Sequence, residues 1–289
     1  ARGPHTIYAV DYYSLITGLP DLLLDESKSS YSVSKFKEIC KESLTVADKQ
    51  LIDYFFLKYD CLNVVKLLKN PDAKIDEKGN LTIDECRELI AQSDEMNTQV
   101  PCGAPRFLMD FILEYPQKKD LPGFFAEDAV LLEYYRYAMQ CGEAEIASWF
   151  ELNFNVTNIL TAFIARNYGW KVEDYVLDEN EVSETILKNV QTKDFNLAPI
   201  VDYVEEVIKI AECEDPVMKE KRIDAFKWMW LDDQTFFEPF SIVSVFAYLC
   251  KLDMCERWDI LDAETGRETF TQIVDNLRSE ARVPDEFKK

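Results

Sequence analysis

Two pairs of polar side chains with the same spacing carry the most distinctive chemistry in this sequence. Asp60 is followed three residues later by Asn63, and Asn155 is followed three residues later by Asn158. At the start of a helix, an Asp or Asn side chain accepts a hydrogen bond from a backbone N–H that has no partner within the helix. We therefore interpret both pairs as caps at points where one helix turns into the next. Ligand binding is the alternative role.

The residue types that most enzymes use for nucleophilic or metal chemistry are scarce. The only histidine is His5, and the sequence has no glycine-rich phosphate loop. Carboxylates are abundant, but neighbouring ones such as Glu205 and Glu206 are expected to lie on a solvated helix surface. We expect no catalytic residue, no bound metal, no cofactor and therefore no enzyme activity.

Neither the cysteines nor the glycine-containing loop at residues 71–81 indicates a metal site. The eight cysteines are scattered without a Cys-x-x-Cys pair, so we expect reduced, buried thiols. A calcium loop with Gly79 at its sixth position would place Lys74 and Lys78 among the ligands. Those two cations exclude an EF-hand.

Charge and composition restrict the class of protein and of partner. With 32 Lys and Arg against 54 Asp and Glu, the net charge is −22, which repels nucleic acid and favours basic protein partners. No apolar run approaches the ~20 residues that a membrane span needs, and we recognise no signal peptide. We expect a cytoplasmic protein in which residues 1–6 are a processed or foreign end.

The elements that must position the polar pairs recur along the chain. Residues 54–65 align without a gap on residues 149–160, at an offset of 95 residues, with aromatic residues, a leucine and the polar pair at matching positions. A third copy is expected near residues 246–256, where Asp253 and Glu256 would form the pair. Such matches indicate an internal repeat.

The predicted fold is all-α, a helical bundle of about three pseudo-repeats with little or no sheet. Apolar residues recur at helical spacing, and only 8 Gly and 11 Pro interrupt 289 residues. The expected repeats are residues 7–100, 101–212 and 213–280, in one compact body. Thr82 and Glu85 form a predicted capping box, and helices are expected to break near Asp60 and Asn155.

The repeats resemble the C subunit of bacterial and archaeal V-type (A-type) ATPases, which is equivalent to the d subunit of the eukaryotic enzyme. The resemblance lies in YDCLNV at 59–64, in FNVTNI at 154–159 with ARNYG at 165–169, and in FAYLCKLDMCE at 246–256. The second pair departs from the family pattern by beginning with Asn, and the third by ending in Glu. The opening YYSLITGLPD at 12–21 instead resembles an uncharacterised bacterial family associated with V-type ATPase operons.

This resemblance implies an all-helical, non-catalytic protein of the rotor's central stalk. Its partners would be the rotor stalk subunits and the membrane proteolipid ring of an ATPase or ATP synthase that transports protons or sodium ions. It would lie in the cytoplasm, peripheral to the inner face of the cell membrane and not spanning it. The alternative from another class is a helical-repeat scaffold for a different protein partner, and a carboxylate-dependent enzyme comes third.

Overall fold

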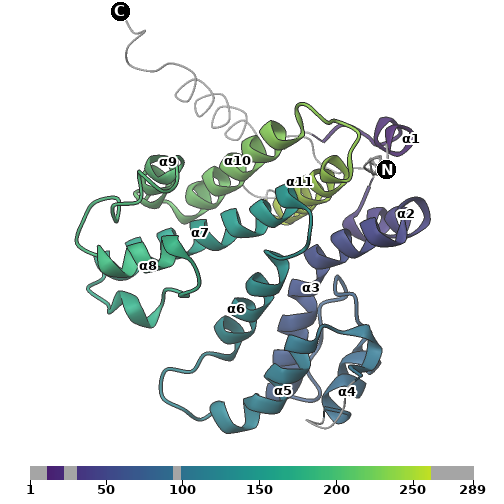
Figure 1. The fold of residues 1–289 in the computed structure, drawn as a ribbon, viewed down its shortest axis with the longest axis horizontal. Helices are drawn as coiled ribbons and strands as arrows, with labels where there is room; N and C mark the ends of the chain where they lie inside the picture. Colours follow the sequence, from purple (N-terminus) through teal and green to yellow (C-terminus); the bar gives the residue numbers. More distant parts are fainter. Residues whose placement is uncertain (1–11, 23–30, 94–98, 262–289) are drawn as a thin grey trace, which may run out of the picture. The chain divides into compact units, whose positions relative to one another are not determined.

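A computed structural model describes residues 12–22, 31–93 and 99–261 of the chain. Over this part the protein forms eleven α-helices, two short 3-10 turns and no strand, which confirms the all-α prediction (Figure 1). The α-helices are α1 (Tyr13–Thr17), α2 (Val33–Ser43), α3 (Val46–Lys69), α4 (Ile83–Ala91), α5 (Arg106–Lys118), α6 (Ala126–Ala138), α7 (Ala144–Asn167), α8 (Glu181–Lys188), α9 (Val204–Ala211), α10 (Pro216–Thr235) and α11 (Ile242–Leu261). The 3-10 turns are η1 (Pro101–Gly103) and η2 (Val172–Asp174).

The chain divides into two compact units. One comprises residues 50–212, and the other combines residues 1–49 with 213–289. The boundary after Glu212 coincides with the expected start of the third repeat. The boundary expected near residue 100 lies inside the first of these units. Division into compact units differs from division into copies, so the three-repeat division stays a prediction.

The unit of residues 50–212 is built around α7. Helices α6, α8 and α9 pack against this helix, and α5 packs against α6. Half of the 24 residues of α7 are buried, among them Trp149, Phe154 and Ile159. The hydroxyl of Tyr134 on α6 donates to the carbonyl of Tyr54 on α3, at 3.1 Å. This bond joins α6 to α3, and the rings of Tyr54 on α3 and Phe150 on α7 lie 6.4 Å apart, so both 24-residue helices contribute to one apolar core.

Both long helices run without interruption through the polar pairs. Helix α3 continues past Asp60 and Asn63, and α7 continues past Asn155 and Asn158. The predicted helix breaks at Asp60 and Asn155 are therefore wrong. Buried apolar residues lie on both sides of each pair, and their packing favours a continuous helix over the capping preference of one side chain.

Two local signals at helix ends are confirmed. Thr82 and Glu85 form the predicted capping box at the start of α4, with both reciprocal hydrogen bonds present. Gly169 lies two residues after the end of α7 and has a φ of 69°. There the Trp170 N–H donates to the carbonyl of Ala165 at 2.8 Å. This bond belongs to a Schellman motif, which requires a residue that tolerates positive φ.

In the other unit, α10 and α11 pack together and α2 packs against α11. The carboxylate of Asp224 is buried, and accepts from the Trp258 indole Nε1–H at 2.7 Å and from Arg257. The rings of Phe36 and Tyr248 lie 5.0 Å apart between α2 and α11. These two hydrogen bonds offset the free energy that is lost when the Asp224 carboxylate is removed from water.

The helices repeat at a constant spacing. Helices α3, α4 and α5 begin at residues 46, 83 and 106, and α7, α8 and α9 begin at 144, 181 and 204, each 98 residues later. Helix α11 begins at residue 242, again 98 residues after α7. This spacing is three residues longer than the 95-residue offset of the sequence match, so Asn155 lies three residues closer to the start of α7 than Asp60 lies to the start of α3.

Candidate functional site

The second residue of each pair makes the same contacts in both copies. Asn63 accepts from the N–H of Asp76 and donates to its carbonyl, both at 2.8 Å. Asn158 accepts from the N–H of Leu177 at 3.0 Å and donates to its carbonyl at 2.8 Å. Each buried amide thus holds both backbone groups of one residue in the loop that follows its helix. We call Asn63 and Asn158 the loop clamps.

The first residue of each pair differs between the copies. The Asp60 carboxylate accepts from the N–H of Leu81 at 2.9 Å, one residue before the cap of α4. Asn155 accepts from the side chain of Asn180, the N-cap of α8, at 2.8 Å, and donates to the Tyr203 hydroxyl at 3.1 Å. The first copy therefore holds an acceptor, and the second holds a closed amide–phenol network.

The third expected pair lies within α11. Glu256 accepts from the N–H of Val33, the first residue of α2, at 2.6 Å, whereas Asp253 is half-buried. None of the six pair residues is the N-cap of the helix that carries it, so the predicted capping role is wrong. Asp60, Asn155 and Glu256 instead reach the start of another, shorter helix. Asp60 bonds to the N–H before the cap of α4, Asn155 to the side chain that caps α8, and Glu256 to the first N–H of α2.

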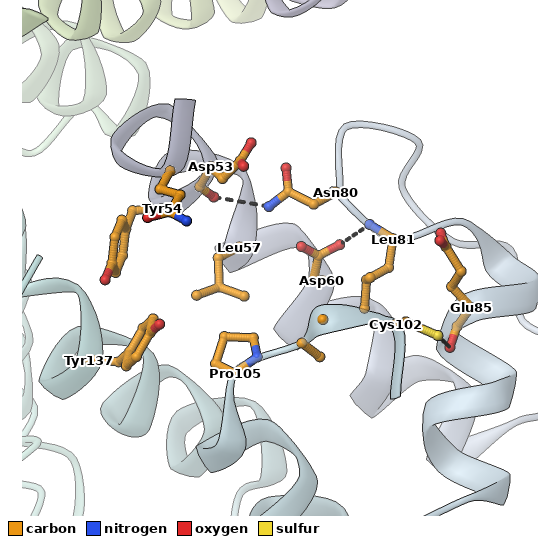
Figure 2. A pocket seen from close by; sticks show the side chains of 13 residues that line it. Asp53, Tyr54, Leu57, Asp60, Asn80, Leu81, Glu85, Cys102, Pro105 and Tyr137 are labelled. Atoms are coloured by element: carbon orange, nitrogen blue, oxygen red, sulfur yellow. Dashed lines mark hydrogen bonds between the residues drawn. The ribbon is translucent and has the colours of Figure 1, made fainter. Parts of the chain in front are cut away.

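A pocket of about 400 Å³ opens beside Asp60. Its apolar side is formed by Tyr54, Leu57, Pro105 and Tyr137, and the two tyrosine rings lie 5.1 Å apart. Figure 2 shows Asp60 and Leu81 on the opposite side of the space from these two rings, with Pro105 between them. Asp60 is the most buried polar residue of this lining, at 1% exposure.

The thiols near the pocket are poor nucleophiles. Burial, helped by the negative charges of Asp60 and Glu85, raises the pKa of Cys86 to about 12. Burial and the charge of Glu88 also raise the pKa of Cys102, which lines the pocket. Since the thiolate is the reactive form, both thiols stay protonated at neutral pH.

Gly79 permits the close approach of the loop to Asp60, and the sequence reasoning missed this role. A Cβ atom at Gly79 would lie 2.4 Å from Asp60 Oδ1 and 3.2 Å from Asn63 Nδ2. Any larger residue would push the loop away from the pair. Its isolated position in the turn at 71–81 gave no signal, because the contact joins residues about twenty positions apart.

Three exposed aromatic rings stack at the end of α7, and the sequence analysis did not single them out. Tyr168 and Trp170 have centroids 5.1 Å apart, and Trp170 and Tyr175 lie 5.4 Å apart. Their exposed fractions are 71%, 49% and 43%. We call Tyr168, Trp170 and Tyr175 the aromatic cluster. Exposed Trp and Tyr side chains in one place are typical of protein-binding surfaces.

Other site types are sparse in the part of the chain that the structure describes. Within those residues no group of three or more His, Cys, Asp or Glu side chains is arranged to hold a metal ion. The same residues contain no helix with the length and hydropathy of a membrane span. All eight cysteines are free thiols, and the expected burial holds for five of them, whereas Cys102, Cys141 and Cys213 are partly exposed.

Comparison with known proteins identifies a family but no activity. No curated protein and no solved structure matches the chain. A family model described as a protein of unknown function, DUF2764, matches residues 9–281. Since that match covers nearly the whole chain, the protein belongs to the DUF2764 family.

Proposed function

We propose that this protein is a non-catalytic subunit of the central stalk of a V-type ATPase or ATP synthase, coupling the rotor stalk to the membrane proteolipid ring. The observation that carries the proposal is the repetition of long helices that begin at residues 46, 144 and 242. The resemblance to the C subunit of V-type ATPases implies three related helical repeats. Helix starts at a constant spacing support that relationship independently of the short sequence motifs.

The repeated contacts suit a mechanical role. In each copy a polar side chain inside a long helix bonds to the start of a shorter helix or to the loop before it. Buried, satisfied polar contacts of this kind fix the relative position of neighbouring elements. A subunit that transmits torque needs such rigidity and surfaces for its partners, and it needs no reactive group.

The aromatic cluster is the surface that we expect a partner to cover. Tyr and Trp side chains supply much of the binding energy at protein interfaces, and the net charge of −22 favours a basic partner. The same cluster would serve the alternative function, a helical-repeat scaffold for an unrelated protein. The identity of the bound partner separates the two.

Affinity purification at two salt concentrations tests this proposal. Recovery of rotor stalk and proteolipid subunits at physiological salt, weakening at 1 M salt where the screening length falls to about 3 Å, would support the stalk role. Reproducible recovery of an unrelated protein with no ATPase subunit would favour the scaffold. The protein would then lie in the cytoplasm without the expected association with the inner face of the membrane.

Replacing one ring tests the contact surface. Trp170→Ala should weaken partner binding at least about tenfold, because such side chains dominate interface energies. The thermal midpoint should hardly change, since the ring is half exposed. Phe237→Ala is the matched control, because Phe237 is an exposed aromatic residue outside the cluster, at 87% exposure. Equal binding by both variants would remove the aromatic cluster from the interface.

A further inference from the structure

The residue before the third helix of each copy lies beside the first residue of the polar pair, and it differs between the copies. Tyr203 stands immediately before α9 and Pro105 immediately before α5, and these two helices begin 98 residues apart. The Tyr203 hydroxyl lies 3.1 Å from Asn155 Nδ2. Pro105 has no hydroxyl and no long side chain, and it lines the open pocket instead. At the residue before the third helix, the second copy thus has a hydroxyl bonded to its polar pair, whereas the first copy has Pro105 in the lining of an open pocket.

The chemistry of this open position differs from that of the filled one. An ionised carboxylate only accepts hydrogen bonds, whereas the amide of Asn155 both accepts and donates. A group that meets Asp60 from the side of Pro105 must therefore be a donor. Asp53, Asp60 and Glu85 line the pocket, and none of its lining residues is Lys or Arg. The balance of charge favours a positively charged donor.

The pocket walls add a preference for a cation with an aliphatic stem. The rings of Tyr54 and Tyr137, together with Leu57 and Pro105, form the wall of the pocket opposite Asp60 (Figure 2). Aromatic faces attract ammonium and guanidinium groups, and apolar walls cover methylene groups. A planar guanidinium also forms strong paired hydrogen bonds with a carboxylate.

We propose that this pocket binds a guanidinium or ammonium group carried on a short aliphatic chain, with Asp60 as the acceptor. The group comes either from an Arg or Lys side chain of a partner protein or from a free small cation. The pocket and its comparison with the second copy carry this inference. It stands whether or not the protein belongs to an ATPase stalk.

Titration of the full chain with a matched pair of probes tests the proposal. In isothermal titration at physiological salt, n-butylguanidinium should bind at one site per chain. Its neutral, nearly isosteric analogue n-butylurea should bind at least tenfold more weakly. Equal binding of the two probes, or no binding of n-butylguanidinium and of a short Arg-containing peptide, would overturn the proposal. If the Arg-containing peptide binds more tightly than n-butylguanidinium, the natural ligand is a side chain of a partner protein. If n-butylguanidinium binds more tightly than the peptide, the natural ligand is a free small cation.

Two variants assign the binding to this pocket. Asp60→Asn reproduces the residue of the second copy, keeps an acceptor for Leu81 and should weaken n-butylguanidinium binding at least tenfold. Pro105→Tyr should place a side chain in the pocket, in the way that Tyr203 lies beside Asn155 in the second copy, and should block binding. It also provides a second test if Asp60→Asn does not fold. Asp72→Asn removes an exposed carboxylate outside the pocket and should leave binding unchanged. Unaltered binding in both pocket variants would place the cation elsewhere and refute the assignment.

Discussion

The helix pairs α3–α4 and α7–α8 are two copies of one arrangement, and they differ in one position of the polar pair. Both copies keep an asparagine clamp, Asn63 or Asn158, with the same two hydrogen bonds to the following loop. At the other position the first copy has Asp60 beside an open pocket, whereas the second has Asn155 closed in by Tyr203. The two arrangements therefore share the clamp contacts and differ at the first position of the pair.

The two sites also differ in how the hydrogen bonds of their buried polar group are made. A buried polar group is costly unless its hydrogen bonds are made. The second copy satisfies Asn155 entirely from within the chain, through Asn180 and Tyr203. The first copy instead keeps a buried carboxylate at the wall of a pocket that solvent or a ligand can enter. The first site therefore combines a charged acceptor with space for another molecule, whereas the second has a neutral amide bonded within the chain.

The largest effect should come from removing either loop clamp. Asn63→Ala and Asn158→Ala each lose two hydrogen bonds to one loop residue. After Asn63→Ala the carbonyl of Asp76 keeps only the longer bond from the Gly79 N–H, at 3.5 Å. We expect each to lower the free energy of unfolding by about 2–4 kcal/mol. Urea denaturation followed by circular dichroism measures both losses.

Asn153→Ala is the control for the loop clamps. Asn153 lies on α7 near the pair, but its side chain bonds only to the carbonyl of Trp149 in its own helix. Its replacement should change stability by less than about 0.5 kcal/mol. A large loss in only one of the two clamp variants would show that the copies do not share this structural requirement.

The next largest loss of stability should come from filling the close contact between Gly79 and Asp60 in the first copy. Gly79→Ala would place a Cβ atom 2.4 Å from the buried Asp60 carboxylate, so the loop or the carboxylate must move. We expect a loss of about 1–3 kcal/mol from this overpacking, measured by the same urea denaturation. Gly18→Ala adds a Cβ at ordinary contact distances of 3.4 Å or more and should be nearly neutral. A neutral Gly79→Ala would mean that the loop is not held against the pair.

Local chemistry explains which features the sequence could predict. Scarce Gly and Pro with helical periodicity indicated the all-α class, and the Thr82–Glu85 box depends on residues only three positions apart. Pro216 at the first position of α10, after the Asp215 cap, is local in the same way. The gapless match of two 12-residue segments likewise indicated the repeat without any knowledge of the helices. All these signals lie within a few residues or within one repeated segment.

The features that the sequence reasoning missed depend on distant residues. The capping interpretation of Asp60 considered only its own helix, whereas its partner, Leu81, lies 21 positions away. The pocket requires Pro105 and Tyr137 to meet Asp60 across separate helices. No periodicity or spacing encodes that meeting. A comparison of Pro105 with Tyr203 becomes possible only once the 98-residue spacing of helices is known.

The smallest loss of stability is expected from a substitution in the second copy. Tyr203→Phe removes the hydroxyl next to Asn155 and should lower the free energy of unfolding by about 1 kcal/mol at neutral pH, the typical net worth of one hydrogen bond. Tyr175→Phe is the control, because Tyr175 is exposed at 43% and should lose almost nothing. The variant also creates a small space beside Asn155, which resembles the first copy more closely than the wild type does.

This last difference should depend on pH. Burial, aided by the charges of Glu151 and Asp202 and opposed by the hydrogen bond from Asn155, raises the pKa of Tyr203 to about 12, above the value near 10 of an unfolded tyrosine. The folded state therefore holds this proton more tightly, and the resulting stability is complete below about pH 10 and lost between about pH 10 and 12. Tyr203→Phe lacks that titration, so the stability gap between wild type and variant should narrow as the pH rises from 9 to 11. Urea midpoints of both proteins at pH 8, 9, 10 and 11 measure the gap. A gap that widens over this range would show that the phenolate is favoured in the folded state and that the Tyr203 site is open to solvent, like the pocket of the first copy.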